Sequence, residues 1–153
     1  MRTLGNFLWI IAGGFFASLA WVIIGCIAFI SIIGIPWGRA CFVMAKLSLA
    51  PFGKTVMSRK DLNQKEDVGT GALGTLGNIV WLVTGGWIMA LSHTLYGAFC
   101  CVTIIGIPFG IQHFKLGGLA LMPIGKTVVP VEVALAATKM NAEAHVANLR
   151  AGS

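Results

Sequence analysis

The chain has 153 residues, of which 57% are hydrophobic and 10% are charged, and its formal net charge is +6. Soluble domains carry charge on about 25% of their residues, so this composition excludes an ordinary soluble domain and indicates a membrane protein. The basic excess suits the cytoplasmic flanks of membrane segments, which meet anionic lipid. Because Lys and Arg form no stripe with interleaved aromatic residues, we expect the lipid bilayer as the partner and no nucleic acid.

The first long apolar segment covers residues 7–33 and contains no charged residue. As a helix it would be about 40 Å long, enough to cross roughly 30 Å of hydrocarbon with a tilt or a bend. Gly34, Ile35 and Pro36 interrupt it, since Gly suits the end of one helix and Pro the first turn of the next. This G-I-P segment can be a hairpin apex or a kink within a longer helix, and we favour the apex.

A shorter apolar arm, residues 36–50, follows the break and leads into P-F-G-K-T-V at residues 51–56. The arm would form about 22 Å of helix, which is short for a span and suits a re-entrant or interfacial segment. Lys46 lies inside the arm and is a candidate intramembrane polar residue, whereas Lys54 is expected at the lipid headgroups. The charged, Gly-rich stretch 57–75 indicates a cytoplasmic linker.

The whole pattern then occurs a second time. Shifting the sequence by 72 residues aligns 4–56 with 76–128 without a gap, and 22 of 53 positions are identical. In the second copy His93 and Lys115 are the candidate intramembrane polar residues, and Lys126 is expected at the headgroups. The paired breaks give the candidate membrane-break or pore residues, namely Gly34, Ile35, Pro36, Gly38, Gly106, Ile107, Pro108 and Gly110.

The distribution of charge predicts how each repeat meets the membrane. If each repeat enters and returns as a hairpin, eight basic residues share one side: Arg2, Lys54, Arg59, Lys60, Lys65, Lys126, Lys139 and Arg150. A single crossing per repeat gives no such bias, so the positive-inside rule favours hairpins. We predict two parallel repeats with the linker and both termini in the cytoplasm. An apex near Trp21 and His93, with G-I-P as a kink, is the alternative.

The predicted fold is therefore an all-α, multi-pass membrane protein of two tandem parallel hairpin repeats. Residues 1–56 form the first repeat, 57–75 the linker and 76–128 the second repeat. The tail, residues 129–153, mixes charged residues with Ala, Val and Leu and predicts a cytoplasmic helix. The two G-K-T-V segments can form short strands that pair with each other.

No motif in the chain predicts catalysis or a cofactor. The G-K-T segments resemble the end of a P-loop, but Ser48 and Ala120 stand where that loop needs Gly. Residues 69–74 match G-x-G-x-x-G, yet no strand precedes them, so we interpret them as part of the linker. The cysteines and histidines lack the spacing of metal ligands. We expect no metal, no cofactor and no enzyme activity.

The segments I-I-G-I-P-W-G and P-F-G-K-T-V, which recur as T-I-I-G-I-P-F-G and P-I-G-K-T-V-V, resemble those of the bacterial YccF-type inner-membrane proteins. The resemblance covers about residues 1–145. It implies two copies of one domain, with two membrane segments per copy, in the inner membrane, and it implies no established activity.

Gly within apolar runs lets helices pack closely, within or between subunits. We expect a homo-oligomer, because four short elements expose much lateral surface. The leading functional hypothesis is a channel or transport component in which irregular backbone at G-I-P lines a cavity. The alternative is a structural or partner-binding membrane module, which the shortage of intramembrane polar groups favours.

Overall fold

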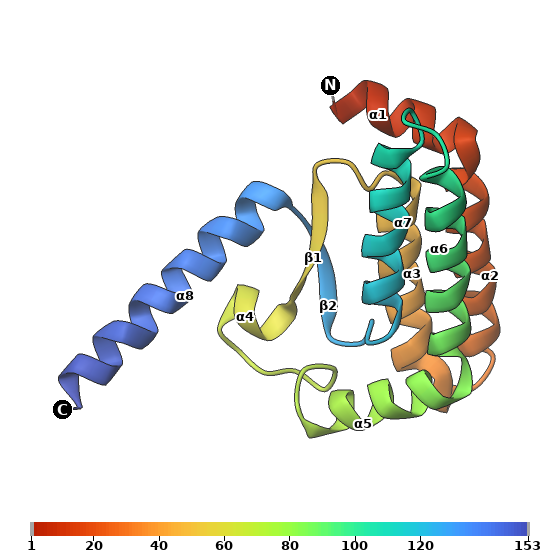
Figure 1. The fold of residues 1–153 in the computed structure, drawn as a ribbon. Helices are drawn as coiled ribbons and strands as arrows, with labels where there is room; N and C mark the ends of the chain where they lie inside the picture. Colours follow the sequence, from red (N-terminus) through yellow and green to blue (C-terminus); the bar gives the residue numbers. More distant parts are fainter. Residues whose placement is uncertain (1, 153) are drawn as a thin grey trace.

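The structure, a computed structural model that describes residues 2–152, consists of two helical hairpins, a pair of short strands and a projecting C-terminal helix (Figure 1). Its helices and strands are α1 (Arg2–Trp9), α2 (Phe15–Phe29), α3 (Ile35–Leu49), β1 (Lys54–Ser58), α4 (Arg59–Asn63), α5 (Ala72–Trp81), α6 (Trp87–Cys100), α7 (Ile107–Ala120), β2 (Lys126–Pro130) and α8 (Val131–Ala151). The first hairpin packs α2 against α3, and the second packs α6 against α7. Helix α8 forms most of the expected tail, residues 129–153.

Both G-I-P segments lie at the turns of the hairpins. At each turn a hydroxyl side chain accepts a hydrogen bond from the glycine amide, from Gly34 N–H to Ser31 Oγ and from Gly106 N–H to Thr103 Oγ1, both at 3.0 Å. The following proline occupies the first turn of the next helix, where its missing N–H costs no hydrogen bond. The alternative apex, in the middle of the long apolar runs, is wrong because those residues lie inside α2 and α6.

Each long apolar run bends sharply before its hairpin instead of continuing as one straight helix. Short segments at Ile10–Gly14 and Leu82–Gly86 join α1 to α2 and α5 to α6, and Figure 1 shows α1 and α5 lying across opposite ends of the hairpins. Gly13 has a φ of 129°, a conformation that essentially only glycine adopts. The bend brings Trp9 Nε1 within 2.6 Å of the Ser48 carbonyl oxygen, and this hydrogen bond ties the run to the end of α3.

The two G-K-T-V segments form the strand pair β1–β2, which confirms that they pair. The pairing is antiparallel, with Val56 opposite Val128, and these two residues are themselves equivalent in the repeat. Gly53 and Gly125 precede the strands with φ of 78° and 83°, so both strands begin with the same turn. The interval 57–75, expected as a plain linker, contains the end of β1, helix α4 and the start of α5.

The second hairpin runs in the opposite direction to the first, so the two units are inverted relative to each other; the predicted parallel topology refers to the membrane and stays a prediction. In Figure 1 the apex of α2–α3 lies beside α5, and the apex of α6–α7 lies beside α1 at the other end. The contacts agree, since Trp37 Nε1 donates to the Gly77 carbonyl oxygen at 3.1 Å and the Trp9 ring stacks on Phe109 at 6.2 Å. In an antiparallel strand pair, a residue lies opposite its own repeat equivalent only when a two-fold rotation relates the two units. This rotation makes the second unit run in the opposite direction to the first.

The core lies where the two inverted units meet. Its largest fully buried side chains include Trp9, Trp21, Met44, Leu47 and Leu116, which come from both hairpins. Met44 and Leu116 are equivalent positions of the repeat, so the core is built around the two-fold relation. Burial of these aromatic and aliphatic side chains is the main source of stability at the contact between the repeats.

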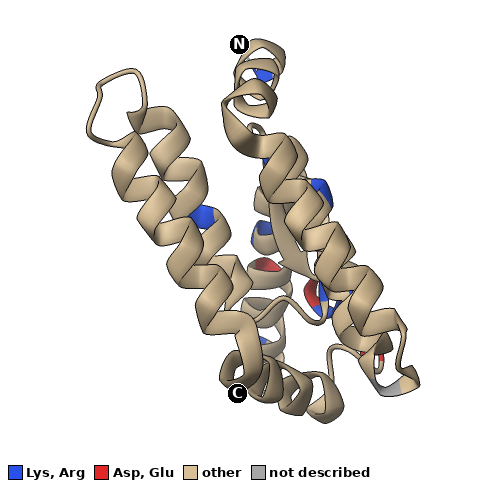
Figure 2. Ribbon diagram, turned by 90° about the vertical axis from the view of Figure 1, so that its right-hand side faces the viewer, with Lys and Arg blue, Asp and Glu red and all other residues tan. Residues whose placement is uncertain are grey.

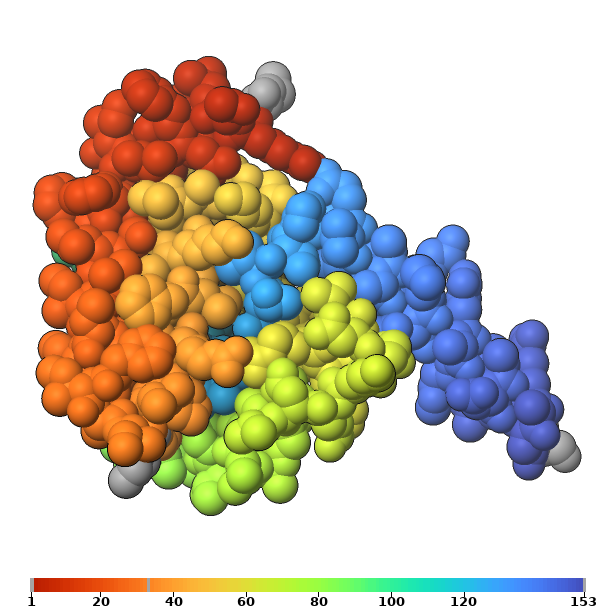
Figure 3. All heavy atoms as spheres, turned by 180° about the vertical axis from the view of Figure 1, so that it is seen from behind, coloured from red at the N-terminus to blue at the C-terminus, as the bar shows by residue number. Residues whose placement is uncertain are grey.

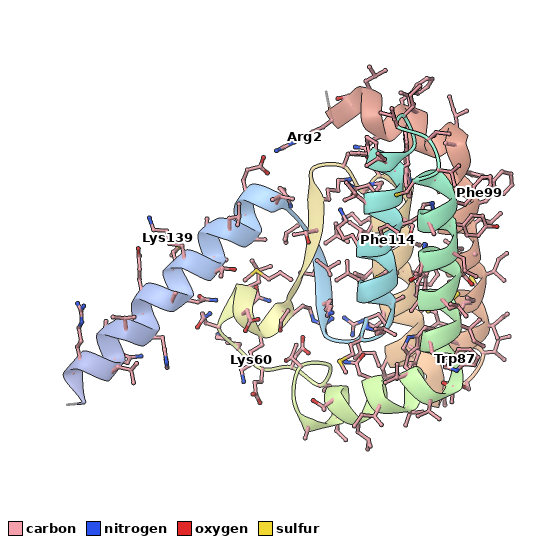
Figure 4. The ribbon with its side chains drawn as sticks, viewed as in Figure 1. Arg2, Lys60, Trp87, Phe99, Phe114 and Lys139 are labelled. Atoms are coloured by element: carbon pink, nitrogen blue, oxygen red, sulfur yellow. The ribbon has the colours of Figure 1, made fainter. Side chains whose placement is uncertain are left out.

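Charge and apolar surface are segregated to opposite sides of the molecule. Helices α2 and α6 and both turns contain no charged residue, and Figure 2 shows these two helices in front with the charged residues behind them. In Figure 4 Phe99 projects outward from α6, where its side chain is 78% exposed. Arg2, Lys60 and Lys139 lie on the other side, around α4 and α8. An apolar side of this kind suits contact with lipid, and the charged side suits contact with water.

Candidate functional site

The predicted membrane-break residues form the turn of each hairpin and the close contact between its two helices. A Cβ atom on Gly34 or Gly106 would lie 1.9 Å from a backbone oxygen of the preceding helix, so only glycine fits at the turn. Gly38 allows close packing of the hairpin helices, because its missing Cβ would lie 3.1 Å from the Gly25 oxygen, and a Cβ on Gly110 would lie 2.7 Å from the Gly97 oxygen. Ile35, Pro36, Ile107 and Pro108 are in the first turns of α3 and α7.

The inversion separates these two sets of break residues. They lie at opposite ends of the molecule, and the structure does not bring them together as the lining of one cavity.

The predicted lysines also separate into different surroundings. Lys115 Nζ donates to the backbone oxygens of Pro51 and Lys54, at 2.8 and 2.9 Å, and so links α7 to the turn before β1. Lys54 and Lys126 are half-buried at the starts of the two strands, and burial lowers the pKa of the Lys126 ammonium. Lys46 is exposed on α3. None of these four lysines joins His93 in a common site.

His93 is the predicted residue around which a polar site assembles. It is buried, and the Trp21 indole Nε1 donates to its Nε2 at 3.2 Å. Its Nδ1 lies 3.1 Å from Nδ1 of His113, which is also buried. Because indole N–H only donates, His93 Nε2 must be the acceptor and the proton of neutral His93 lies on Nδ1. His93 therefore donates to His113, whose own proton lies on Nε2.

The three residues form a continuous hydrogen-bonded chain between the two repeats. Trp21 comes from α2, His93 from α6 and His113 from α7, and the positions of Trp21 and His93 are equivalent in the repeat. Contact between equivalent positions occurs only close to the two-fold relation. The chain thus lies at the centre of the interface between the inverted units.

Aromatic rings enclose the far end of this chain. The Trp9 ring centre is 4.6 Å from that of His113, and the Tyr96 ring stacks on His113 at 5.8 Å. All five carboxylates of the chain lie in the linker, in α4 and in α8, so a proton taken up by the histidine pair has no acidic partner in the hairpins. The faces of Trp9 and Tyr96 are the groups that can stabilise a cation on His113.

A cavity of about 560 Å³ lies beside the histidine pair, between α2 and α6. Its polar lining comes from Ser92, His93, Tyr96 and His113, and the rest of its wall is apolar. A largely apolar cavity with a few convergent polar groups is the usual form of a small-molecule site. The arrangement can hold a small polar group against the imidazoles, or pass a proton along the pair.

Sequence reasoning singled out His93 but missed Trp21, His113 and Trp9. The signal that could have found Trp21 is the repeat itself, because residues 21 and 93 are equivalent and both carry a ring N–H. No such signal exists for His113, whose repeat equivalent is Cys41.

Comparison with known proteins places the chain in a family. The model of the YccF inner membrane component domain matches it twice, at residues 4–54 and 76–126. The chain belongs to the YccF family. It is 40% identical over 143 residues to the inner membrane protein YccF of Escherichia coli (strain K12) and to the protein of the same name from Shigella flexneri. Each match covers 93% of this chain and 97% of the relative, and no solved structure matches.

The two YccF domains correspond to the two inverted units. Each extends from the cross-lying helix, α1 or α5, through a hairpin to the first residue of its strand. The Trp21–His93–His113 chain therefore joins one YccF domain to the other. The name of the relatives gives a location, the inner membrane, and no activity.

Proposed function

We propose that this YccF-family protein is a non-enzymatic transport component of the bacterial inner membrane, and that its histidine pair carries a proton. The observation behind the proposal is the hydrogen-bonded chain Trp21–His93–His113 at the interface of two inverted repeats, beside a cavity in the apolar half of the molecule. Transporters built from internal repeats bind substrates and coupling ions at the interface of their repeats, and ionisable groups within membrane segments often mark ion or substrate pathways.

The location of the charged residues supports a placement in which the apolar side of the molecule enters the membrane from the cytoplasm. The long helical stretches Arg2–Phe29 and Ala72–Cys100 are long and apolar enough to cross a membrane. Each stretch is bent, however, and its hairpin helix is shorter: α2 is about 22 Å long and α6 about 21 Å. Both lengths are below the roughly 30 Å thickness of the hydrocarbon layer. We propose that α2 and α6 lie in the membrane, and that the linker, the strand pair and both termini stay in the cytoplasm. The ion pair between Arg2 and Glu132, which holds the N-terminus next to the start of α8, supports a shared side for the termini.

A complete passage across the bilayer then needs more than one chain. The hairpin helices of one molecule are shorter than the hydrocarbon layer is thick. The cavity lies between α2 and α6, and none of its lining residues belongs to the strand pair. We therefore propose a homo-oligomer that joins the cavities of its subunits. The mass of the complex extracted in mild detergent tests this point, and a monomer at all concentrations would contradict it.

A proton-flux assay tests the transport role. Purified protein is reconstituted into liposomes that contain a pH-sensitive dye, and a potassium diffusion potential drives proton entry. We expect flux above that of protein-free liposomes, and a loss of at least about tenfold in His93→Gln and His113→Gln, because an amide cannot take up and release a proton at neutral pH.

The chain offers a matched control for this assay. His145 is exposed on α8, far from the cavity, so His145→Gln should keep the full flux. Circular dichroism and gel filtration of each variant establish that it is folded. Wild-type flux equal to that of protein-free liposomes, or equal flux in wild type and His93→Gln, would overturn the proposed role.

One observation favours the second candidate, a partner-binding membrane module. Helix α8 has 21 residues and none of them is buried, and Figure 3 shows it projecting away from the rest of the molecule. Affinity purification at native abundance, with the full chain and with a chain that ends at residue 130, tests this role. A protein retained by the full chain and lost with the truncation would support a partner-binding module; recovery of the chain alone in several growth conditions would contradict it.

A further inference from the structure

The structure contains a second cavity, of about 510 Å³, between the apex of the first hairpin and α5. We call it the apex groove, and its apolar wall includes Pro36, Trp37 and Ala40 from α3 and Leu73, Gly77 and Val80 from α5. Figure 3 shows this face, with the orange first hairpin next to the green α5. The groove thus lies beside helices that carry exposed apolar side chains, where acyl chains can reach it.

The two-fold relation provides an internal comparison for this groove. Trp37 and Ile124 line it, and their equivalents at the other end of the molecule are Phe109 and Phe52. There the two phenylalanine rings pack against each other, with ring centres 5.9 Å apart, and the Phe52 ring also fills the space above Gly5. Ile124, which lines the groove, is smaller than the phenylalanine at the equivalent position of the other end.

The same comparison shows that positive charge is specific to the open groove. Arg39 and Arg59 line it, whereas their equivalents, Ile111 and Val131, are apolar. The guanidinium of Arg59 is bound by Asp67, at 2.6 and 2.8 Å. Arg39 has no acidic partner among residues 2–152. The groove therefore has one uncompensated positive charge next to an apolar wall.

We propose that the apex groove binds one anionic phospholipid, with its phosphate on Arg39 and an acyl chain along the wall formed by α3 and α5. The choice of an anionic lipid rests on charge complementarity, because the groove has a net charge of +1 and a lipid such as phosphatidylglycerol has a charge of −1. The guanidinium group suits a phosphate because it can donate two parallel hydrogen bonds. The proposal does not depend on the transport role.

Native mass spectrometry tests the proposal on the full chain in detergent. Phosphatidylglycerol and phosphatidylcholine of the same acyl chains are offered together, and we expect a preference of about tenfold for the anionic lipid, because the choline cation of phosphatidylcholine offsets the charge of the phosphate that both lipids carry. Two variants introduce the residue that the other repeat has at the equivalent position. Arg39→Ile should abolish the preference, and Ile124→Phe should reduce binding of both lipids by filling the groove while Arg39 stays in place.

Lys46→Ala is the matched control, because it also removes one exposed positive charge from α3 outside the groove. It should leave the preference unchanged. Equal preference in wild type and Arg39→Ile, or undiminished binding in a folded Ile124→Phe, would overturn the proposal. Competition by soluble glycerol 3-phosphate at the same concentration would also overturn it, because the site would then recognise a free phosphate and not a lipid.

Discussion

The inverted arrangement makes a sharp prediction about which cysteine pairs can be cross-linked. In the antiparallel register Thr55 lies opposite Val129, whereas its repeat equivalent, Thr127, lies opposite Met57. Directly opposite Cα atoms are about 5 Å apart, within the roughly 7 Å limit for a disulfide. Thr127 is displaced by two residues, about 6.8 Å along the strand, which places its Cα about 8.4 Å from that of Thr55. Parallel repeats would reverse this preference.

The assay compares two double-cysteine variants in a background without the four native cysteines. A protease site inserted after Gln64, in the exposed linker, allows the two halves to be separated after oxidation. With Thr55→Cys and Val129→Cys the halves should stay joined on a non-reducing gel, and with Thr55→Cys and Thr127→Cys they should separate. Single-cysteine variants detect links between molecules. The opposite pattern would refute the inverted arrangement.

Three further predictions concern stability, measured by denaturant or thermal unfolding in detergent. Asn6 makes two hydrogen bonds to the backbone after α3, and Asn78 makes two to the backbone after α7. Each alanine substitution should therefore lower the free energy of unfolding by about 2 kcal/mol. The double variant should lose the sum of the two, because the sites lie apart. Gly13→Ala should cost about 1–3 kcal/mol through its backbone alone, since open space surrounds it; an unchanged stability would contradict the positive φ. Arg59 holds the pKa of Asp67 well below its usual range, so the pair stabilises the fold above about pH 4 and this contribution is lost as the pH falls below that value; Asp67→Asn should remove this acid sensitivity.

Several elements of the fold follow from local features of the sequence. The turns at G-I-P could be predicted because glycine and proline restrict the backbone wherever they occur. The strand pair was predicted from the duplicated G-K-T-V segments, and α8 from the mixed composition of the tail. The sequence predicts a tilt or a bend in the long apolar run but does not locate it, because the tryptophan that holds each bend makes its hydrogen bond 39 residues away.

The candidate site was less accessible from the sequence. His93 stood out as a polar residue in an apolar run, but His113 lies in a different helix, and its contact depends on how α6 and α7 face each other. Nothing in the sequence distinguishes Arg39, because its importance appears only when the open groove is compared with the packed phenylalanine rings at the other end.

The sequence by itself determined that this protein belongs in a membrane, that it is duplicated, and where each copy turns. Composition, periodicity and a fixed shift of 72 residues carry that information along the chain. The tertiary structure alone decided how the copies face each other. Two similar hairpins can dock in parallel or inverted with the same local structure, and the charge pattern that favoured parallel repeats is satisfied equally when all charges gather on one side. The choice depends on contacts between distant residues, namely the Val56–Val128 register and the Trp21–His93 hydrogen bond.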